Sequence, residues 1–406
     1  MHNGYLVAII LSTLFWLNLA SILYTYFGYP LLISFMPKKR RNLPETEKPF
    51  TPYVTLLIAA YNEEIVIEEK IKNSLQIEYP KEKLQILITA DGSNDNTPAI
   101  VEQYADQGVE LLYKPERRGK MAAINRAIPH AQGEILVFSD ANNHYQPDTI
   151  QKLVMPFSDP QVAATSGAKV IDKGGSGAVG SSEGLYWKYE SHIKKQESRI
   201  DSCTSVAGEI LAVRKSAYIP PPDNIVNDDF FIAMQVLRQG YRLVYVPEAR
   251  SSERASPSAR DEVIRRTRIN AGRYQAIAMA RHILPLNRPL LTWQVISHKF
   301  LRPIVPFNMI AVLLINTIAV SIPYNRPDNW LHLSNPFGVI FLGLQAVFYL
   351  LAAIGMSAGG GKPAGKISRI LYLPAFLTNS NYAALKGFFQ FMRGKQLHMW
   401  ERVQRQ

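Results

Sequence analysis

Three long stretches of the sequence lack charged side chains. Asp, Glu, Lys and Arg are absent from residues 1–37, 303–325 and 329–361. A helix needs about 20 residues to cross the hydrocarbon core of a membrane, and each stretch provides that many. The averages conceal this pattern, because a hydrophobic content of 47% and a mean hydropathy of −0.06 are typical of soluble proteins. The distribution of charge therefore predicts a multi-pass membrane protein and excludes a freely soluble one.

Basic residues indicate which side of the membrane is cytoplasmic. The chain has 45 Lys and Arg against 33 Asp and Glu, a net charge of +12, and four basic residues at 38–41 directly follow the first stretch. Cytoplasmic flanks of membrane helices carry such an excess, whereas a cleaved signal peptide carries it before the apolar run. We therefore expect residues 1–37 to be an uncleaved anchor in the cell membrane. The single cysteine, Cys203, excludes a disulfide framework and a Cys-rich zinc module.

The central part of the chain predicts an α/β domain. A proline-containing linker at 38–52 is followed by short apolar runs that alternate with helical patterns, which favours a mainly parallel sheet over residues 53–260. Expected strands span 54–60, 84–90, 109–113, 134–139, 162–164, 208–213 and 242–246. Expected helices span 63–75, 97–107, 120–128, 148–157 and 228–238. The glycine-rich residues 174–177 predict a mobile loop within this domain.

The rest of the chain returns to the membrane. Residues 261–299 combine apolar residues at near-helical spacing with several arginines, which predicts amphipathic helices on the membrane surface. Residues 300–406 form the expected C-terminal membrane region, with spans at about 303–322 and 336–356. The last apolar segment, 371–391, is followed by Arg393, Lys395, Arg402 and Arg405. Because a full span would export these charges, we expect this segment to lie at the interface.

Polar motifs follow the first two expected strands. Residues 59–64 read Ala-Ala-Tyr-Asn-Glu-Glu, and Asp91-Gly92-Ser93 ends the next strand. Ligands in open α/β sheets bind beyond the carboxyl ends of the strands, so Ala59, Tyr61, Glu63 and Asp91 are candidate nucleotide-binding residues. Each motif has a structural alternative: the glutamates suit a helix N-terminus, and Asp91 suits a tight turn.

Two further motifs suit phosphate and a metal ion. Lys120 follows Gly119 at an expected helix start, where a cation suits phosphate oxygens, although the residues are equally consistent with a solvated basic helix start. Asp140 and Asn142 end another strand, and their side-chain oxygens suit Mg²⁺ or Mn²⁺. The alternative for this pair is an ordinary Asp- and Asn-rich turn. We also count Asp140 among the nucleotide-binding candidates.

Adjacent acids open the last expected helix of the domain. Asp228 and Asp229 follow Asn227 after a proline-rich loop. They are consistent with a favourable helix N-terminus or with a general base that takes a proton from an attacking hydroxyl.

Together, these motifs make residues 52–300 resemble family 2 glycosyltransferases of the GT-A fold, the group that includes cellulose, hyaluronan and poly-N-acetylglucosamine synthases. The Ala-Tyr-Asn-Glu-Glu run is similar to the first nucleotide-binding motif of the family. Asp91-Gly92-Ser93 resembles its DDGS element, Gly119-Lys120 with Asn125 its GKxxALN element, and Asp140-Ala141-Asn142 its Asp-x-Asp motif. Asn227-Asp228-Asp229 stands where synthases carry Thr-Glu-Asp.

The chain departs from the family pattern at three places. Ala90 replaces the first aspartate of DDGS, and Asn142 replaces the second metal-binding aspartate. The stretch Arg265-Arg266-Thr267-Arg268-Ile269 replaces Gln-x-x-Arg-Trp, so it lacks the tryptophan that would stack on an acceptor sugar. The absence of this tryptophan weakens the expectation of processive polysaccharide synthesis.

The resemblance implies a membrane-anchored inverting glycosyltransferase that uses a nucleotide-diphospho-sugar, expected to be a UDP-sugar. Asp229 is then the general base with Asp228 beside it, and Asp140 and Asn142 hold Mg²⁺ or Mn²⁺. Lys120, Arg265, Arg266 and Arg268 provide positive charge near the diphosphate or the acceptor. The implied partners are the nucleotide-sugar, a glycan or lipid acceptor, and membrane lipids.

Two other functions deserve comparison with this expectation. A catalytically silent scaffold with the same fold is favoured by Ala90 and Asn142. A nucleic-acid binder would use the +12 charge, but the basic clusters at 38–41, 265–281 and 393–405 all flank membrane segments, which fits anionic lipid better. We therefore expect no nucleic-acid partner.

Overall fold

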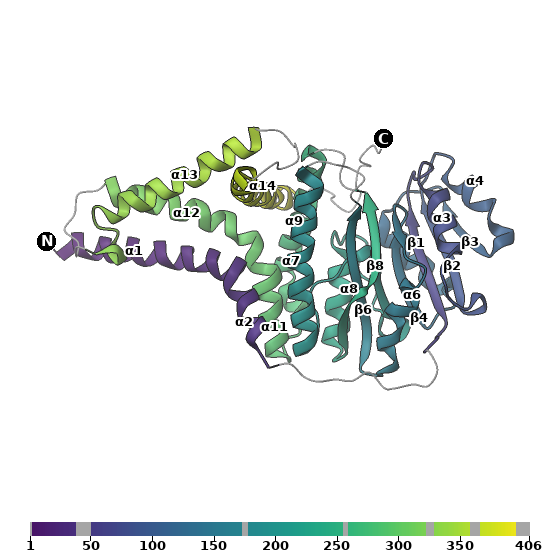
Figure 1. Ribbon diagram of the computed structural model, residues 1–406. Helices are drawn as coiled ribbons and strands as arrows, with labels where there is room; N and C mark the ends of the chain where they lie inside the picture. The colour runs from purple at the N-terminus through teal and green to yellow at the C-terminus, as the bar shows by residue number, and fades with distance from the viewer. Residues whose placement is uncertain are drawn as a thin grey trace.

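The computed structural model describes residues 2–37, 50–172, 178–254, 259–321, 329–357 and 366–394. Most of the predicted linker (38–49), the glycine-rich residues 174–177 and the basic C-terminus (395–406) lie outside this part of the chain. Figure 1 shows a sheet domain at one end and long helices that extend away from it on one side. The two parts meet at three helices, α7 (Ala178–Ile200), α9 (Ala259–Ala278) and α11 (Pro289–Val295).

The sheet has eight strands in the order β3-β2-β1-β4-β7-β6-β8-β5. Parallel pairing joins β1 (Val54–Ala60), β2 (Leu84–Asp91), β3 (Val109–Lys114) and β4 (Ile135–Asp140). The other half contains β5 (Asn143–Tyr145), β6 (Val162–Asp172), β7 (Leu211–Arg214) and β8 (Arg242–Arg254). There β7 runs antiparallel to β4 and β6, whereas β6 and β8 are parallel. The sheet is thus mixed, with its parallel block at the nucleotide-binding motifs.

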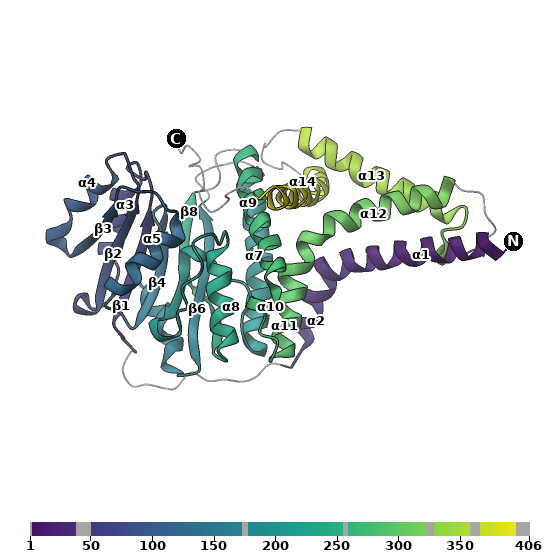
Figure 2. The same ribbon diagram turned by 180° about the vertical axis from the view of Figure 1, so that it is seen from behind.

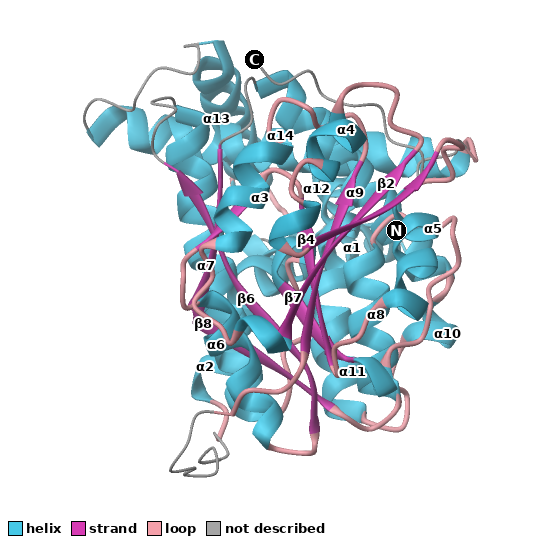
Figure 3. Cartoon of the chain, turned by 90° about the vertical axis from the view of Figure 1, so that its right-hand side faces the viewer, coloured by secondary structure: helices cyan, strands magenta, loops and turns pink. Residues whose placement is uncertain are grey.

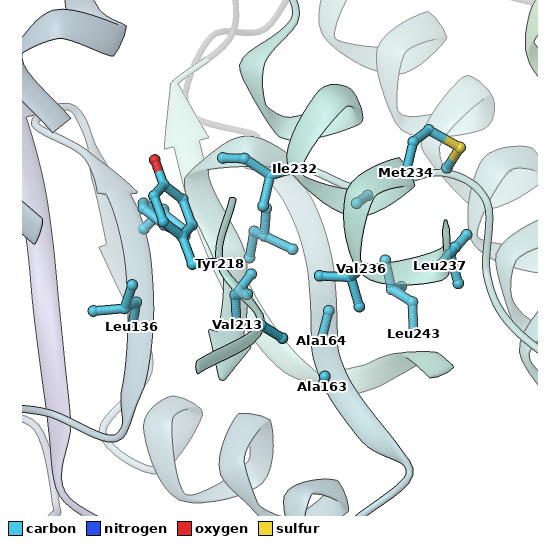
Figure 4. Close-up of a cluster of buried hydrophobic side chains, with 14 of the residues drawn as sticks. Leu136, Ala163, Ala164, Val213, Tyr218, Ile232, Met234, Val236, Leu237 and Leu243 are labelled. Carbon is cyan, nitrogen blue, oxygen red and sulfur yellow. The ribbon is translucent and has the colours of Figure 1, made fainter. Parts of the chain in front are cut away.

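Helices cover both faces of the twisted sheet (Figure 3). One face carries α5 (Lys120–Ala127) and α8 (Asp228–Arg238), and the other carries α3 (Ile67–Leu75), α4 (Thr97–Glu102) and α6 (Thr149–Val154). Leu57 of β1 packs in the first core, whereas Leu56 and Ile58 pack in the second. Strands buried on both faces need continuous apolar runs, which explains why β1 is readable from sequence. Figure 4 shows Ile232 and Val236 of α8 packed over Val213 of β7.

The membrane part contains three helical stretches long and apolar enough to cross a bilayer: Leu6–Phe35, Pro289–Ser321 and Phe337–Ser357. The first joins α1 (His2–Leu23), the π-helical turn η1 (Tyr24–Gly28) and α2 (Tyr29–Phe35). The second joins α11, the π-helical turn η8 (Ile296–Phe300) and α12 (Leu301–Ser321), and the third is α13. In the most apolar 18-residue stretch of α13, only 11% of the residues are buried within the protein. Its other side chains are available to lipid, as a span requires.

The second candidate span begins at Pro289, whereas the sequence predicts a span at about 303–322. The expected interfacial region at 261–299 includes α11 and η8, which continue directly into α12. The last long helix, α14 (Lys366–Met392), is not among the candidate spans within the described residues. Figure 1 views α14 along its axis, so it crosses the direction of α1 and α12 and packs beside α9. Its predicted place at the membrane interface stays a prediction.

Candidate active site

The predicted site residues gather at the carboxyl ends of the parallel strands. β1 lies between β2 and β4, with Ala60 paired to Ala90 and Ala59 paired to Asp140. Two of these strands therefore end at Asp91 and Asp140, and Tyr61 directly follows the third, as expected for a ligand site in an α/β sheet. The starts of α5 and α8 add Lys120 and Asp228 to the same edge.

The first motif is a tightly bonded turn. Asn62 has a positive φ of 52°, and its side chain exchanges hydrogen bonds with Asn94: Nδ2 donates to Asn94 Oδ1 at 2.7 Å, and Asn94 N donates to Asn62 Oδ1 at 2.9 Å. The backbone N–H of the buried Glu63 donates to Thr97 Oγ1 at 2.8 Å. These bonds fix the turn that presents the Tyr61 ring, which packs under the Arg117 guanidinium at 3.9 Å.

Asp91 holds the loop before α5. Its Oδ2 accepts the backbone N–H groups of Arg118 at 2.9 Å and Gly119 at 2.7 Å, and its Oδ1 accepts from Arg126 at 3.3 Å. Gly92 has a φ of +71°, and a Cβ there would lie 2.6 Å from Arg117 Cβ, so only glycine permits this close packing. The sequence predicted Asp91 as a base-binding residue. That role stays a prediction, whereas the structure shows that the Asp91 carboxylate shapes the Arg117–Gly119 loop.

A lysine links the metal motif to the acidic helix start. Lys120 Nζ lies 2.8 Å from Asp140 Oδ1 and 3.4 Å from Asp228 Oδ2. Burial alone lowers the pKa of Lys120, but the surrounding carboxylates of Asp140, Asp228 and Asp229 outweigh it and raise the pKa above its ordinary value. Lys120 is therefore a permanent cation between two acids, where a diphosphate would find a partner.

Asp229 has the properties required of a general base. Burial, together with the charge of neighbouring Asp228, raises the pKa of the Asp229 carboxyl to about 6. Its Oδ1 accepts the backbone N–H of Phe230 at 2.7 Å. Gly208 packs directly against it, since a Cβ at Gly208 would lie 3.1 Å from Asp229 Cβ. A carboxyl with a pKa near 6 can accept a proton more readily than an ordinary aspartate.

The three predicted arginines of α9 separate into two groups. Arg268 faces the site: burial lowers its pKa, while Asp228, Asp140 and Asp229 act in the opposite direction. Arg265 instead donates to Glu262 from Nε at 2.9 Å and from Nη2 at 2.7 Å. Arg266 donates to the same carboxylate at 2.5 Å and packs over the rings of Tyr186 and Phe376. The structure thus brings Arg268 to the acidic edge and directs Arg266 toward α7 and α14.

The candidate metal ligands have suitable chemistry but are few. Asp140 offers a half-exposed carboxylate, and no hydrogen bond ties the Asn142 amide within the described residues. The same part of the chain contains no cluster of three or more His, Cys, Asp or Glu arranged to hold a metal. Oxygen donors of this kind fit Mg²⁺ or Mn²⁺, with further ligands supplied by the ion's waters or a substrate.

A buried network behind the metal motif was missed from sequence. Lys70 Nζ donates to the backbone oxygen of Asn143 at 2.8 Å and to its Oδ1 at 3.2 Å, and lies 4.5 Å from the centre of the Tyr145 ring. Asn143 Nδ2 donates to Glu209 O and Ser251 Oγ at 3.0 and 2.8 Å. These contacts fix the β4–β5 turn that contains Asn142. A lysine among the apolar positions of α3 was the only sequence signal.

Comparison with known proteins shows what the sheet domain is similar to. Residues 55–219 match the family model described as glycosyl transferase family 2. This part of the chain is therefore similar to family 2 glycosyltransferases. Poly-beta-1,6-N-acetyl-D-glucosamine synthase of Staphylococcus aureus (strain COL) is 26% identical over 246 residues, which cover 59% of this chain and 57% of the relative. The probable glycosyltransferase YdaM of Bacillus subtilis (strain 168) is 30% identical over 168 residues, covering 37% of this chain and 39% of the relative.

A solved structure shares the fold of nearly the whole chain. The mannosyltransferase PcManGT from Pyrobaculum calidifontis, in complex with GDP-Man and Mn²⁺, superposes with a TM-score of 0.71 at 22% identity. The likeness covers 95% of this chain and 99% of that one. It confirms the predicted GT-A fold and extends it to the arrangement of the helices outside the sheet domain.

Proposed function

We propose that this protein is a membrane-anchored inverting glycosyltransferase that transfers a sugar from a nucleotide-diphospho-sugar to a hydroxyl acceptor. The observation that carries the proposal is the meeting of Lys120 with Asp140 and Asp228 at the strand ends, beside Asp229 with its raised pKa. One edge of the sheet thus carries candidate groups for binding a nucleotide, for binding its diphosphate and for acting as the general base. The match to the family 2 model supports the same reaction class.

The proposed reaction is a single displacement. The acceptor oxygen attacks the anomeric carbon from the face opposite the diphosphate, and Asp229 takes its proton. The bond between the anomeric carbon and the diphosphate oxygen breaks, and the nucleoside diphosphate leaves with both electrons of that bond. Lys120 and Arg268 then face the negative charge that grows on the leaving group, and this kind of stabilisation is a large contribution to catalysis.

We propose Mg²⁺ or Mn²⁺ as cofactor, held by Asp140 and Asn142. When bound, the cation would neutralise charge on the diphosphate. We propose that the nucleobase of the donor binds in a subsite formed by Tyr61, Glu63 and Asp91, together with the turn and the loop that these residues hold. Ala59 pairs with Asp140 across β1 and β4, so we propose that Ala59 contributes to the subsite through its backbone.

The proposed donor is a UDP-sugar, and the proposed acceptor is a glycan or a lipid. The name of the staphylococcal relative, a polysaccharide synthase, supports polymer synthesis, whereas the complex of PcManGT contains GDP-Man and Mn²⁺. Purified full chain is therefore incubated with UDP- and GDP-sugars, membrane lipid extract and Mn²⁺, and the released nucleotide is measured. Release from UDP-sugars supports the proposal, release from GDP-sugars alone changes the donor, and no release from any donor favours the silent scaffold.

We also propose that the sheet domain lies on the cytoplasmic side of the cell membrane. The three candidate spans support a membrane location. The cluster of basic residues at 38–41 that follows the first span supports the sidedness.

A further inference from the structure

An open cavity of about 290 Å³ lies beside α5, next to the Arg117–Gly119 loop. Three segments line it with polar side chains: Lys114, Glu116 and Arg118 at the end of β3 and in the following loop, Asn125 and Arg126 on α5, and Asp223 after the prolines at 220–222. Small-molecule sites in proteins measure about 300–1,000 Å³. The cavity therefore has room for one small ligand.

The cavity is separate from the proposed donor site. Among the described residues that line it, none belongs to the group of Tyr61, Lys120, Asp140 and Asp229. Arg117 and Lys120, on either side of Arg118 and Gly119, contact Tyr61 and Asp140 instead. Figure 2 shows α5 and β2 in the part of the sheet domain that lies away from the membrane helices. The proposed sugar transfer thus leaves this cavity without a role.

Three cations of the cavity suit an anion. Arg118 Nη2 lies 3.2 Å from Asp223 Oδ2, but their side chains are 66% and 42% exposed, so this ion pair is weak. Lys114 is exposed, and it forms no ion pair with any residue that the structure describes. Lys114 and Arg118 are therefore available to a ligand.

Arg126, the third cation, has spare hydrogen-bonding capacity. Its Nη1 lies 3.3 Å from Asp91 Oδ1, and its Nη2 lies 3.4 Å from both Thr89 Oγ1 and Ala90 O. These distances exceed the usual 2.9–3.0 Å. Its Nε is buried and has no partner within the described part of the chain. A guanidinium held so loosely can turn toward the oxygens of a phosphate, which its planar N–H groups match.

The cavity also offers acceptors for hydroxyl groups. Glu116 is exposed and forms no ion pair within the described residues, and Asp223 Oδ1 accepts only a long bond of 3.3 Å from Asn125. Ala122 is the one apolar side chain in the described lining, and the lining contains no aromatic ring. A nucleobase or a lipid chain would find no matching surface here. A phosphate joined to a hydroxyl-rich group matches both kinds of lining residue.

Two walls of the cavity are bonded to loops of the proposed active site. Arg126 bonds to Asp91, which holds the loop that leads into Lys120. Asn125 donates to Pro221 O at 2.9 Å, in the loop that precedes the acidic start of α8. A phosphate that draws Arg126 away from Asp91 therefore loosens the loop before Lys120. A ligand in the cavity can thus act on nucleotide binding from outside the nucleotide site.

We propose that this cavity is a regulatory site for a small sugar phosphate, with its phosphate on Lys114, Arg118 and Arg126 and its hydroxyl groups on Glu116 and Asp223. The ligand weakens nucleotide binding, because its phosphate competes with Asp91 for Arg126. It is neither the donor nor the acceptor of the proposed reaction. Only its effect on nucleotide binding rests on the proposed function.

Calorimetric titration of glucose 1-phosphate into the purified full chain in detergent tests the site, with glucose and inorganic phosphate as comparison ligands. The variants are Lys114→Met and Glu116→Ala, since both side chains are exposed and their loss spares the fold. Lys81→Met is the matched control, because Lys81 is an exposed cation of η2 (Lys81–Lys83), at the opposite end of β2.

Glucose 1-phosphate should bind more tightly than either comparison ligand. Lys114→Met should weaken the binding of glucose 1-phosphate and of inorganic phosphate about tenfold. Glu116→Ala should weaken only glucose 1-phosphate, and Lys81→Met should change neither. Equal affinity for glucose 1-phosphate and inorganic phosphate, or wild-type affinity in both cavity variants, would overturn the inference.

A second titration separates regulation from competition at one site. Glucose 1-phosphate should raise the Kd of UDP or GDP about fivefold, and saturating nucleotide should weaken glucose 1-phosphate by the same factor and no further. Complete displacement, or no mutual effect, contradicts a regulatory site. Nucleotide release is measured on the same samples. Turnover without glucose 1-phosphate binding contradicts only the cavity site, whereas binding that depends on Lys114 in a chain without turnover supports the site and contradicts only the proposed function.

Discussion

At the residue scale, the proposed metal site has only two side-chain ligands, Asp140 and Asn142. Asp140→Ala should weaken Mn²⁺-dependent nucleotide binding, because it removes the only carboxylate of the Asp140–Asn142 pair. Calorimetric titration of the nucleotide with and without Mn²⁺ measures this effect. Asp106→Ala, at an exposed position, is the control. An unchanged metal dependence in Asp140→Ala would disprove the assignment.

Lys70 provides a second test at this scale, because it acts on the metal motif through Asn143. Burial lowers the pKa of Lys70 to about 7, against the opposing effects of Asp140 and Glu209. Lys70→Met leaves the Asn143 oxygens without this donor, at a cost of roughly 1–3 kcal/mol. We expect a lower melting temperature and weaker Mn²⁺ affinity.

Lys72→Met is the matched control for Lys70. It lies on the same helix, and its pairing with Glu68 is exposed, so its contribution to stability is small. If Lys70→Met loses stability but binds Mn²⁺ like the wild type, Lys70 supports only the fold.

The motif residues at strand ends could be predicted from sequence because parallel strands end at one edge. Their partners could not. Asp91 bonds to backbone N–H groups of a loop 27 and 28 residues later, and no local pattern encodes such a contact. Arg265, Arg266 and Arg268 look alike in sequence, and only the packing of α9 decides that Arg268 faces the acids.

At the element scale, the contact between α9 and α14 positions the site. A Cβ at Gly387 of α14 would lie 2.8 Å from Asn270 Cβ and from Thr267 O, so the helices touch at this glycine. On its other side α9 packs Gly272 against Asn227, the residue before the acidic helix start. Displacement of α14 therefore moves both Arg268 and the start of α8.

Gly387→Leu should thus lower turnover strongly while the protein remains in the membrane. Gly343→Leu on α13 is the matched control, because no atom lies within 4 Å of a Cβ placed there. Nucleotide release by both purified variants measures the effect. Equal activity of Gly387→Leu and Gly343→Leu would show that α14 does not position the site.

The helices and strands with a clear local sequence pattern were the ones whose bounds could be predicted. The expected span of β1 matches the structure, and that of α8 does as well. By contrast, β6 and β8 extend far beyond 162–164 and 242–246, because their polar ends pair with each other and not with a core. The long helix α7 was not predicted, since it combines polar and apolar residues and depends on contacts with β6, β8 and α2.

At the scale of the whole molecule, the proposed topology can be tested with introduced cysteines. Burial raises the pKa of the Cys203 thiol to about 12, so the native cysteine is unreactive toward maleimides. Lys188→Cys lies on α7, on the same side as the sheet domain, and Asn329→Cys lies between the second and third candidate spans. In intact cells, an impermeant maleimide should label Asn329→Cys alone.

Permeabilised cells supply the control for this experiment, because there both cysteines should react. Labelling of Lys188→Cys in intact cells would place the sheet domain outside and contradict the topology. The absence of charged residues was enough to predict the spans from sequence. The junction of α7 with α12 could not be predicted in this way, because it joins segments that are far apart in the chain.

The most direct test of the central claim is the pH dependence of sugar transfer by wild type and Asp229→Asn. A general base must be deprotonated to act, so with a pKa of about 6 wild-type kcat/KM should fall as pH drops below about 6. Asp229→Asn should bind nucleotide normally, keep its melting temperature, lose roughly 10²–10⁴-fold in turnover and lack this acid limb. Wild-type turnover with the same pH profile in Asp229→Asn would contradict the account.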